Sequence, residues 1–180
     1  MERLATQHPD IWLLRPRVFG DSRGFFLESY NQRVLAELGV AQTFVQDNHS
    51  RSARGVLRGL HYQIQQPQGK LVRVVAGEVF DVAVDLRRSS PHFGKVASFR
   101  LSAASHDMAW IPPGFAHGFL VLSDSADFLY KTTDYYAPEH ERSLLWNDSA
   151  LGIDWPLAGA PQLSAKDQAG LPLADCETFA

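Results

Sequence analysis

Apolar and polar residues alternate with a period of two in several short runs of the chain. Between Glu78 and Leu86, four apolar residues share one face of an extended strand, whereas Asp81 and Asp85 point to the opposite face. The same alternation recurs from Lys95 to Leu101 and from Asp127 to Thr133. The pattern predicts a β-strand in each of these three runs.

Turn-forming residues separate the runs at short intervals, and the runs between them are rich in Val, Phe, Tyr and Leu. This spacing is typical of an all-β sandwich or barrel. The turn signals lie at Gly20-Asp21, Gly69, Gly77, Ser89 to Pro91, Pro112 to Gly114, and Pro138. We therefore predict a jelly roll of two antiparallel sheets.

Helical patterns are few. Residues Asn31 to Gly39 carry apolar side chains at helical spacing, with Asn31 as the expected cap and Gly39 as the stop. Near the C-terminus, Leu163 to Gly170 has the pattern of a capped turn of helix that starts at Ser164. The chain is thus expected to carry only a few short helices.

Composition fits one soluble domain over residues 1–180, because 45% of the residues are hydrophobic and 21% are charged. The formal charge of -3 provides no general attraction for nucleic acid or anionic lipid, and no apolar run is long enough to span a bilayer. Cys176 is the only cysteine, and the N-terminus lacks the pattern of a signal peptide. These features predict a cytoplasmic protein that binds neither nucleic acid nor membrane.

Candidate chemistry is concentrated between Gly55 and Lys70, where His61 lies between Arg58 and Lys70 with no acidic residue in the segment. A histidine beside fixed cations suits the removal and return of a proton from a negatively charged substrate. The alternative is a core histidine that bonds to a backbone carbonyl. In a regular strand Arg58 and His61 would face opposite sides, so a shared pocket requires a bulge, most easily at Gly59.

Two partial cupin motifs accompany this segment. Gly55, five residues and then His61 open the first motif, but Gln63 replaces its second histidine, and Pro67 or Gln68 stands at the position of its glutamate. The second motif is represented by the Pro-x-Gly-x-x-His pattern that ends at His117, without its asparagine. These positions cannot supply a three- or four-ligand metal site. The sequence predicts a cupin-type jelly roll without a metal or other cofactor.

Three further residues have two interpretations each. Lys70 begins a strand and is either a solvated strand end or a cation that holds developing negative charge on an oxygen. Tyr130 is either a packed core tyrosine or a general acid. Asp167, taken alone, is typical of a surface turn.

Together the motifs resemble the dTDP-4-dehydrorhamnose 3,5-epimerase family over nearly the whole chain. The resemblance rests on eight ordered segments: Val18 to Asn31, Phe44 to Ser52, Val56 to Gln63, Gln68 to Arg87, Trp110 to Phe119, Phe128 to Tyr136, Leu144 to Asp148, and Leu163 to Asp167. It implies a metal-free homodimer that acts on a 4-keto-6-deoxyhexose joined to dTDP, in the biosynthesis of activated L-rhamnose.

The resemblance also implies roles for individual residues. His61 would be the base, Asp167 its acidic partner, Lys70 the cation on the enolate oxygen and Tyr130 the proton donor on the opposite face of the sugar. Substrate contacts are implied for a second group of residues: Arg23, Phe26, Glu28, Gln46, Asn48, Arg58, His117, Glu141 and Lys166.

Three rival functions follow from the same residues. An epimerase that inverts only one centre (carbon 3 or carbon 5), or that acts on another dTDP-keto sugar, would share the histidine, aspartate and lysine, although an intact Tyr130 favours double inversion. A cupin that merely binds a nucleotide sugar would have no need of a base facing an acid. A metal-dependent cupin oxygenase is opposed by Gln63 and by the missing glutamate.

Overall fold

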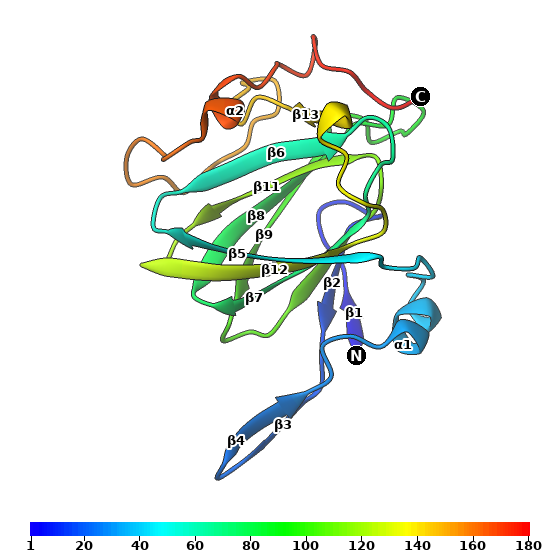
Figure 1. Ribbon diagram of the computed structural model, residues 1–180, viewed down its shortest axis with the longest axis vertical. Coiled ribbons are helices and arrows are strands. Elements are labelled where there is room, and N and C mark those ends of the chain that lie inside the picture. Colours follow the sequence, from blue (N-terminus) through cyan, green and yellow to red (C-terminus); the bar gives the residue numbers. More distant parts are fainter.

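Two antiparallel sheets face each other in the computed structural model, which describes residues 1–180 (Figure 1). The six-stranded sheet has the order β1 (Glu2–Leu4), β2 (Trp12–Arg15), β10 (Met108–Ile111), β7 (Lys70–Ala76), β12 (Ser125–Thr132) and β5 (Gln46–Ala53). The five-stranded sheet has the order β13 (Glu141–Ser143), β6 (Leu57–Gln63), β11 (Phe115–Val121), β8 (Glu78–Asp85) and β9 (Val96–Ser102). The predicted two-sheet jelly roll is confirmed.

The three strands predicted from alternation are β8, β9 and β12, each within two residues of its expected limits. Both faces of β8 are buried. Its outer face packs Val82 and Val84 under the C-terminal segment, whereas its inner face looks into the space between the sheets. Asp81 and Asp85 lie on this inner face and are fully buried, so each carboxylate requires a polar partner inside the barrel.

Helix α1 (Gln32–Glu37) begins and ends where the sequence predicts. The side chain of its N-cap, Asn31, accepts hydrogen bonds from the backbone of the first turn, and Gly39 follows the C-cap with a φ of 101°. Leu35 anchors the helix against the outer face of the six-stranded sheet. No helix in the structure combines the length and the apolar character needed to cross a membrane.

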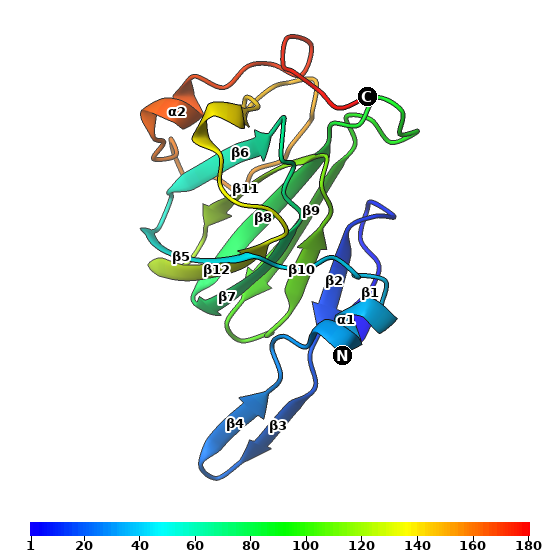
Figure 2. The same ribbon diagram turned by 45° about the vertical axis from the view of Figure 1, so that its right-hand side comes forward.

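The C-terminal third of the chain covers β6 and brings a second helix to it. A 3-10 turn, η1 (Pro138–His140), precedes β13, and α2 (Ala165–Gln168) follows a long irregular segment. Backbone bonds from Leu57 to Gln162 and from Leu145 to Leu171 fasten this segment to the sandwich. Figure 2 shows α2 lying beside one end of β6. As predicted, Ser164 caps α2.

One hairpin stands apart from the sandwich. Strands β3 (Val18–Asp21) and β4 (Gly24–Leu27) pair only with each other and project away from both sheets (Figures 1 and 2). Phe25 and Phe26 on this hairpin are 63% and 68% exposed. Such exposure of large apolar side chains is typical of a surface that another protein covers.

Candidate active site

A bulge in β6 turns two residues of the candidate site to the same side. The register pairs His61 with His117 and Arg58 with Phe119, so β6 carries one more residue than β11 over this interval. Gly59 lies inside the bulge with a φ of 116°, and a Cβ atom there would come within 2.6 Å of the β11 backbone. The predicted bulge is confirmed, and both Arg58 and His61 line one pocket.

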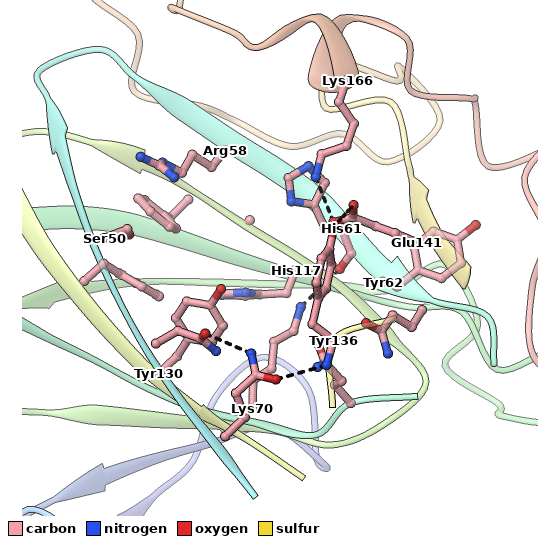
Figure 3. Close-up of a pocket in the computed structure, with 17 residues that line it drawn as sticks. Ser50, Arg58, His61, Tyr62, Lys70, His117, Tyr130, Tyr136, Glu141 and Lys166 are labelled. Atoms are coloured by element: carbon pink, nitrogen blue, oxygen red, sulfur yellow. Dashed lines mark hydrogen bonds and ion pairs between the residues drawn. The ribbon is translucent and has the colours of Figure 1, made fainter. Parts of the chain in front are cut away.

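This pocket lies between the two sheets and encloses about 330 Å³, a size suited to a small ligand. Its walls come from β5, β7 and β12 on one side and from β6, β11 and β13 on the other (Figure 3). Nine of the thirteen predicted site residues line it: Gln46, Asn48, Arg58, His61, Lys70, His117, Tyr130, Glu141 and Lys166.

Asp167 lies behind His61 and is bonded to it. The distance from His61 Nε2 to Asp167 Oδ1 is 2.5 Å, and the backbone N–H of Gly59 donates to the same oxygen at 3.1 Å. Burial raises the pKa of Asp167, but hydrogen bonds from His61 and Ser164 outweigh it and hold this pKa at about 2. The carboxylate is therefore ionised, so Nε2 donates to it and Nδ1 is the nitrogen that can accept a proton.

The partner of His61 is thus a carboxylate and not the backbone carbonyl of the alternative interpretation. The imidazole remains 23% exposed, whereas the Asp167 side chain is only 3% exposed. Asp167 is a buried residue on α2, not a free surface turn. The arrangement gives a histidine that a ligand can reach and whose ring is fixed from behind.

Lys70 reaches the pocket from the first position of β7. Its Nζ donates to the backbone oxygen of His61 at 3.3 Å, so the lysine does not end in bulk solvent. Burial lowers the pKa of Lys70 to about 8, and the negative charge of Glu141 opposes this shift. The ammonium form still predominates at neutral pH, which leaves a desolvated cation beside the candidate base.

Tyr130 approaches from the other sheet. It lies on β12, whereas His61 lies on β6, and its ring packs on Phe128 with the two ring centroids 6.1 Å apart. Burial raises the pKa of Tyr130, and the positive charge of Arg58 opposes this rise. The hydroxyl therefore stays protonated at neutral pH and can serve as a proton donor.

A second histidine–aspartate pair lies at the inner end of the pocket. His117 Nε2 lies 2.9 Å from Asp81 Oδ1, and the side chains are 6% and 0% exposed. Burial raises the pKa of Asp81, whereas His117 acts to lower it. Asp81 was not among the predicted site residues. The alternation in β8 marked its face, but only the sheet pairing shows that this face is interior and adjoins His117.

A chain of hydrogen bonds forms one wall of the pocket. The Tyr136 hydroxyl and Lys166 Nζ donate to the two oxygens of Glu141 at 2.9 and 2.7 Å. At its other end, the Tyr136 backbone N–H donates to Gln46, which in turn donates to Asn48. Burial raises the pKa of Glu141, but its two donors hold this pKa below the ordinary value. The wall thus presents an ionised carboxylate and a lysine close to the pocket.

The second ligand position of the cupin motif has a different task in this chain. Gln63 is buried, and its amide nitrogen donates to the backbone oxygens of Gln66 and Tyr135. Its amide oxygen accepts from the backbone N–H of Ala137 at 2.9 Å. The side chain therefore holds the loop on which Tyr136 is carried, and it has no free group directed at the two histidines.

Three predicted contacts lie away from this pocket. Arg23 and Phe26 belong to the exposed hairpin, where Arg23 pairs with Asp21 at 2.5 Å, and Glu28 directly follows β4. Sequence reasoning also missed lining residues, of which Ser50 had a signal because it continues the alternation of Gln46 and Asn48. The other missed residues are Tyr62, Gln63, Gln68, Gly118, Phe119, Phe128 and Tyr136.

Comparison with known proteins agrees with the motifs. The family model of dTDP-4-dehydrorhamnose 3,5-epimerase matches residues 5–175. The chain is 66% identical over 178 residues to the dTDP-4-dehydrorhamnose 3,5-epimerase of Pseudomonas aeruginosa, covering 98% of this chain and 97% of that protein. Identity to the epimerase of Salmonella typhimurium is 58%, with coverages of 96% and 94%.

A solved structure extends this similarity to the whole fold. The crystal structure of dTDP-6-deoxy-D-glucose-3,5-epimerase from Legionella pneumophila, in complex with dTDP-4-keto-L-rhamnose, superposes with a TM-score of 0.96 at 54% identity. The match covers 98% of this chain and 94% of the Legionella chain. The predicted resemblance is confirmed, and the chain belongs to the dTDP-4-dehydrorhamnose 3,5-epimerase family.

Proposed function

We propose that this protein inverts carbons 3 and 5 of dTDP-4-dehydro-6-deoxy-D-glucose to give dTDP-4-dehydro-L-rhamnose, with His61 as the base. The observation that carries the proposal is the ionised Asp167 behind His61, in a pocket that also holds Lys70 and Tyr130. The similar Legionella enzyme was solved with dTDP-4-keto-L-rhamnose, which supports the same class of ligand here.

The first chemical step is proton abstraction next to a ketone. The carbonyl at carbon 4 acidifies the hydrogens on carbons 3 and 5, so that Nδ1 of His61 can take either proton. The C–H electron pair forms a C=C bond and the carbonyl oxygen becomes an enolate oxygen. The buried ammonium of Lys70 is suited to stabilise this charge, because a fixed cation in a desolvated site acts more strongly than in water.

Inversion requires the new proton to arrive on the opposite face of the ring. Tyr130 projects from the six-stranded sheet, across from His61 on the five-stranded sheet, and can donate its hydroxyl proton to the carbanionic carbon. The positive charge of Arg58 favours the resulting tyrosinate. Before the second inversion, His61 releases its extra proton to solvent and the Tyr130 tyrosinate takes one up from solvent.

The remaining pocket residues are proposed as substrate contacts. Arg58 and Lys166 supply positive charge for the diphosphate, since guanidinium and ammonium groups form charge-assisted hydrogen bonds to phosphate oxygens. The polar side chains of the wall and of the inner end can bind sugar hydroxyls: Gln46, Asn48, His117 and Glu141.

We also propose a homodimer in which the β3–β4 hairpin of one subunit reaches the pocket of its partner. This would place Arg23, Phe26 and Glu28 against the nucleotide, and it would cover the exposed phenylalanines of the hairpin. A mixture of two inactive variants, R23A/E28A and H61A, should then regain activity when subunits exchange, because one mixed pocket is intact. Activity that stays absent in verified mixed dimers would contradict this arrangement.

A cytoplasmic location is proposed as well. The single cysteine, Cys176, is buried and unpaired, which suits a reducing compartment. Fractionation of the native cells should recover the protein with cytoplasmic markers.

The decisive experiment follows deuterium. Purified protein is incubated with dTDP-4-dehydro-6-deoxy-D-glucose in D2O, and NMR monitors carbons 3 and 5 while a following reductase traps the product. Deuterium should enter both carbons, and His61→Ala should abolish the exchange. His49→Ala serves as the matched control, since His49 is an exposed histidine of β5 that does not line the pocket.

The pattern of exchange separates the rival functions. Deuterium at only one carbon would indicate a single-centre epimerase. No exchange in folded protein that still binds dTDP would overturn the enzymatic proposal and leave a binding protein.

A further inference from the structure

The Asp167 carboxylate is held from four directions. Its Oδ1 accepts from His61 Nε2 at 2.5 Å and from the Gly59 N–H at 3.1 Å. Its Oδ2 accepts from the Ser164 hydroxyl at 2.6 Å and from the Ser164 N–H at 3.3 Å. A carboxylate offers about four lone-pair positions, so this group has a donor for each and its plane is fixed.

Ser164 supplies two of these donors and also holds the helix that carries Asp167. Its hydroxyl oxygen accepts from the Asp167 N–H at 3.2 Å, which completes a capping box on α2. Such a short helix is unstable without this kind of support. Ser164 itself lies at the surface and outside the pocket lining.

We propose that Ser164 is a positioning residue for proton abstraction, acting on His61 only through Asp167. This inference rests on the proposed function of His61 as the base. The serine hydroxyl holds Oδ2 so that Oδ1 faces Nε2, which orients the imidazole and leaves Nδ1 directed into the pocket. Its effect on the reaction is therefore larger than its exposed position suggests.

The serine hydroxyl also shares the negative charge of the carboxylate. The hydrogen bond from Ser164 is among those that hold the pKa of Asp167 at about 2. Without it, the carboxylate loses one of its two hydrogen bonds on Oδ2, so that Oδ1 is held less firmly toward His61 Nε2.

The test compares S164A, S164T and the wild type for deuterium exchange, kcat and KM. We expect S164A to lower kcat by roughly 10- to 100-fold, with KM within about twofold, because a misplaced base slows the chemical step. S164T retains the hydroxyl and should restore most of the rate. N31A is the matched control: it removes the side-chain cap of α1, away from the pocket, and should leave kcat and KM unchanged.

A double variant tests whether the effect passes through Asp167. In a D167N background, S164A should add less than about a twofold further loss, since coupled residues are not additive. The other charged groups near the pair, Glu141, Lys166 and Lys70, are intact in every variant and cannot account for a loss of rate specific to S164A.

Three results would overturn the inference: a wild-type rate in S164A, an equal loss of rate in S164A and S164T, or a full additional loss in D167N. Absence of exchange in the wild type would instead count against the proposed function.

Discussion

The barrel contains an open and a sealed version of the same histidine–aspartate pair. His61 and Asp167 meet behind the pocket, and the imidazole keeps part of its surface exposed. His8 and Asp85 meet in the interior, 3.2 Å apart, and both side chains are 0% exposed. Because both sites contain the same two residue types, any difference in function between them must come from their surroundings.

Hydrogen bonding completes the sealed pair. His8 Nε2 bonds to Asp85, and its Nδ1 accepts from the backbone N–H of Asp10, so both ring nitrogens are occupied. Asp85 is bound further by Arg87, which also bonds to Asp10. The ring is enclosed at its edges by Phe115 and His92.

The open pair differs in one nitrogen. Only Nε2 of His61 is bonded within the protein, whereas Nδ1 is available to a ligand. The two carboxylates are alike, because hydrogen bonds hold the pKa of both Asp85 and Asp167 at about 2 despite burial. Access to a second ring nitrogen therefore distinguishes the pair that we propose to be catalytic from the structural one.

The largest expected effect comes from removing the charge of each pair in turn. Asp167→Asn should lower kcat by about 10³-fold or more, since the amide no longer fixes the productive tautomer of His61. Asp85→Asn should leave kcat within about twofold but reduce the free energy of unfolding by about 3 kcal/mol, because it leaves Arg87 without its buried partner.

On the same preparations, deuterium exchange measures the rate of the reaction and urea denaturation measures the free energy of unfolding. The comparison fails if D85N loses activity in parallel with D167N while remaining folded.

A somewhat smaller effect is expected from Gly59→Ala. The new methyl group would lie 2.6 Å from Gly118 Cα and 2.7 Å from the His117 carbonyl oxygen, so the bulge must shift. We expect about a 100-fold lower kcat, because the same bulge aims His61 and presents the N–H that binds Asp167.

Gly55→Ala is the matched control for this variant. Gly55 also has a positive φ, of 77°, but no atom lies within 4 Å of the added carbon. Gly55→Ala should lower the free energy of unfolding by the backbone strain alone, of order 1–3 kcal/mol, and should leave kcat nearly normal. If Gly59→Ala and Gly55→Ala lowered kcat equally, the bulge at Gly59 would have no specific role in placing His61.

Features that depend on nearby residues could be predicted from the sequence, whereas contacts between distant residues could not be predicted from local pattern. The bulge at Gly59 could be predicted, because Arg58 and His61 are close in sequence and their faces follow from the strand period. The pairing of His61 with Asp167 spans 106 residues, and it came from the family resemblance rather than from local pattern. The sealed pair spans 77 residues and carried no motif, so it was missed.

Burial of the aspartates in β8 was missed for a related reason. Alternation showed that Asp81 and Asp85 share a face, but it does not state what lies opposite that face. Aspartates on one face of a strand are typical of a solvated face, whereas here the barrel interior supplies a histidine for each carboxylate. Such pairings are decided by tertiary packing and are invisible to local periodicity.

The pair of His117 and Asp81 lies between the two extremes, since it is buried but adjoins the pocket. His117→Gln keeps a donor that can reach Asp81 but changes the shape of the inner end of the pocket. We expect about a tenfold lower kcat/KM, mostly through KM, because the proposed role of His117 is to bind substrate and not to move a proton. Steady-state kinetics checks this, and a loss confined to kcat would instead assign His117 to proton transfer.

The smallest expected effect is a pH dependence of stability that belongs to the sealed pair. Burial lowers the pKa of His8 below its usual value of 6.5, although Asp85 and Asp10 act to raise it. Below pH 6.5 the unfolded chain therefore binds a proton that the folded chain resists, and stability falls as the pH falls. Arg87 and His92 also face this site and are left intact in the test.

Thermal unfolding of the wild type and His8→Gln between pH 7 and pH 5 measures this effect. Glutamine can donate to Asp85 but does not titrate, so the wild-type Tm should fall by a few degrees more than that of the variant. Above pH 5 the two low-pKa aspartates remain ionised and contribute no slope, because their stabilisation is lost only as the pH falls below about 4. If Tm falls equally with pH in the wild type and in His8→Gln, the buried imidazole of His8 accepts a proton as readily as an exposed one. The two pairs would then differ only in their hydrogen bonds and not in how burial affects their protonation.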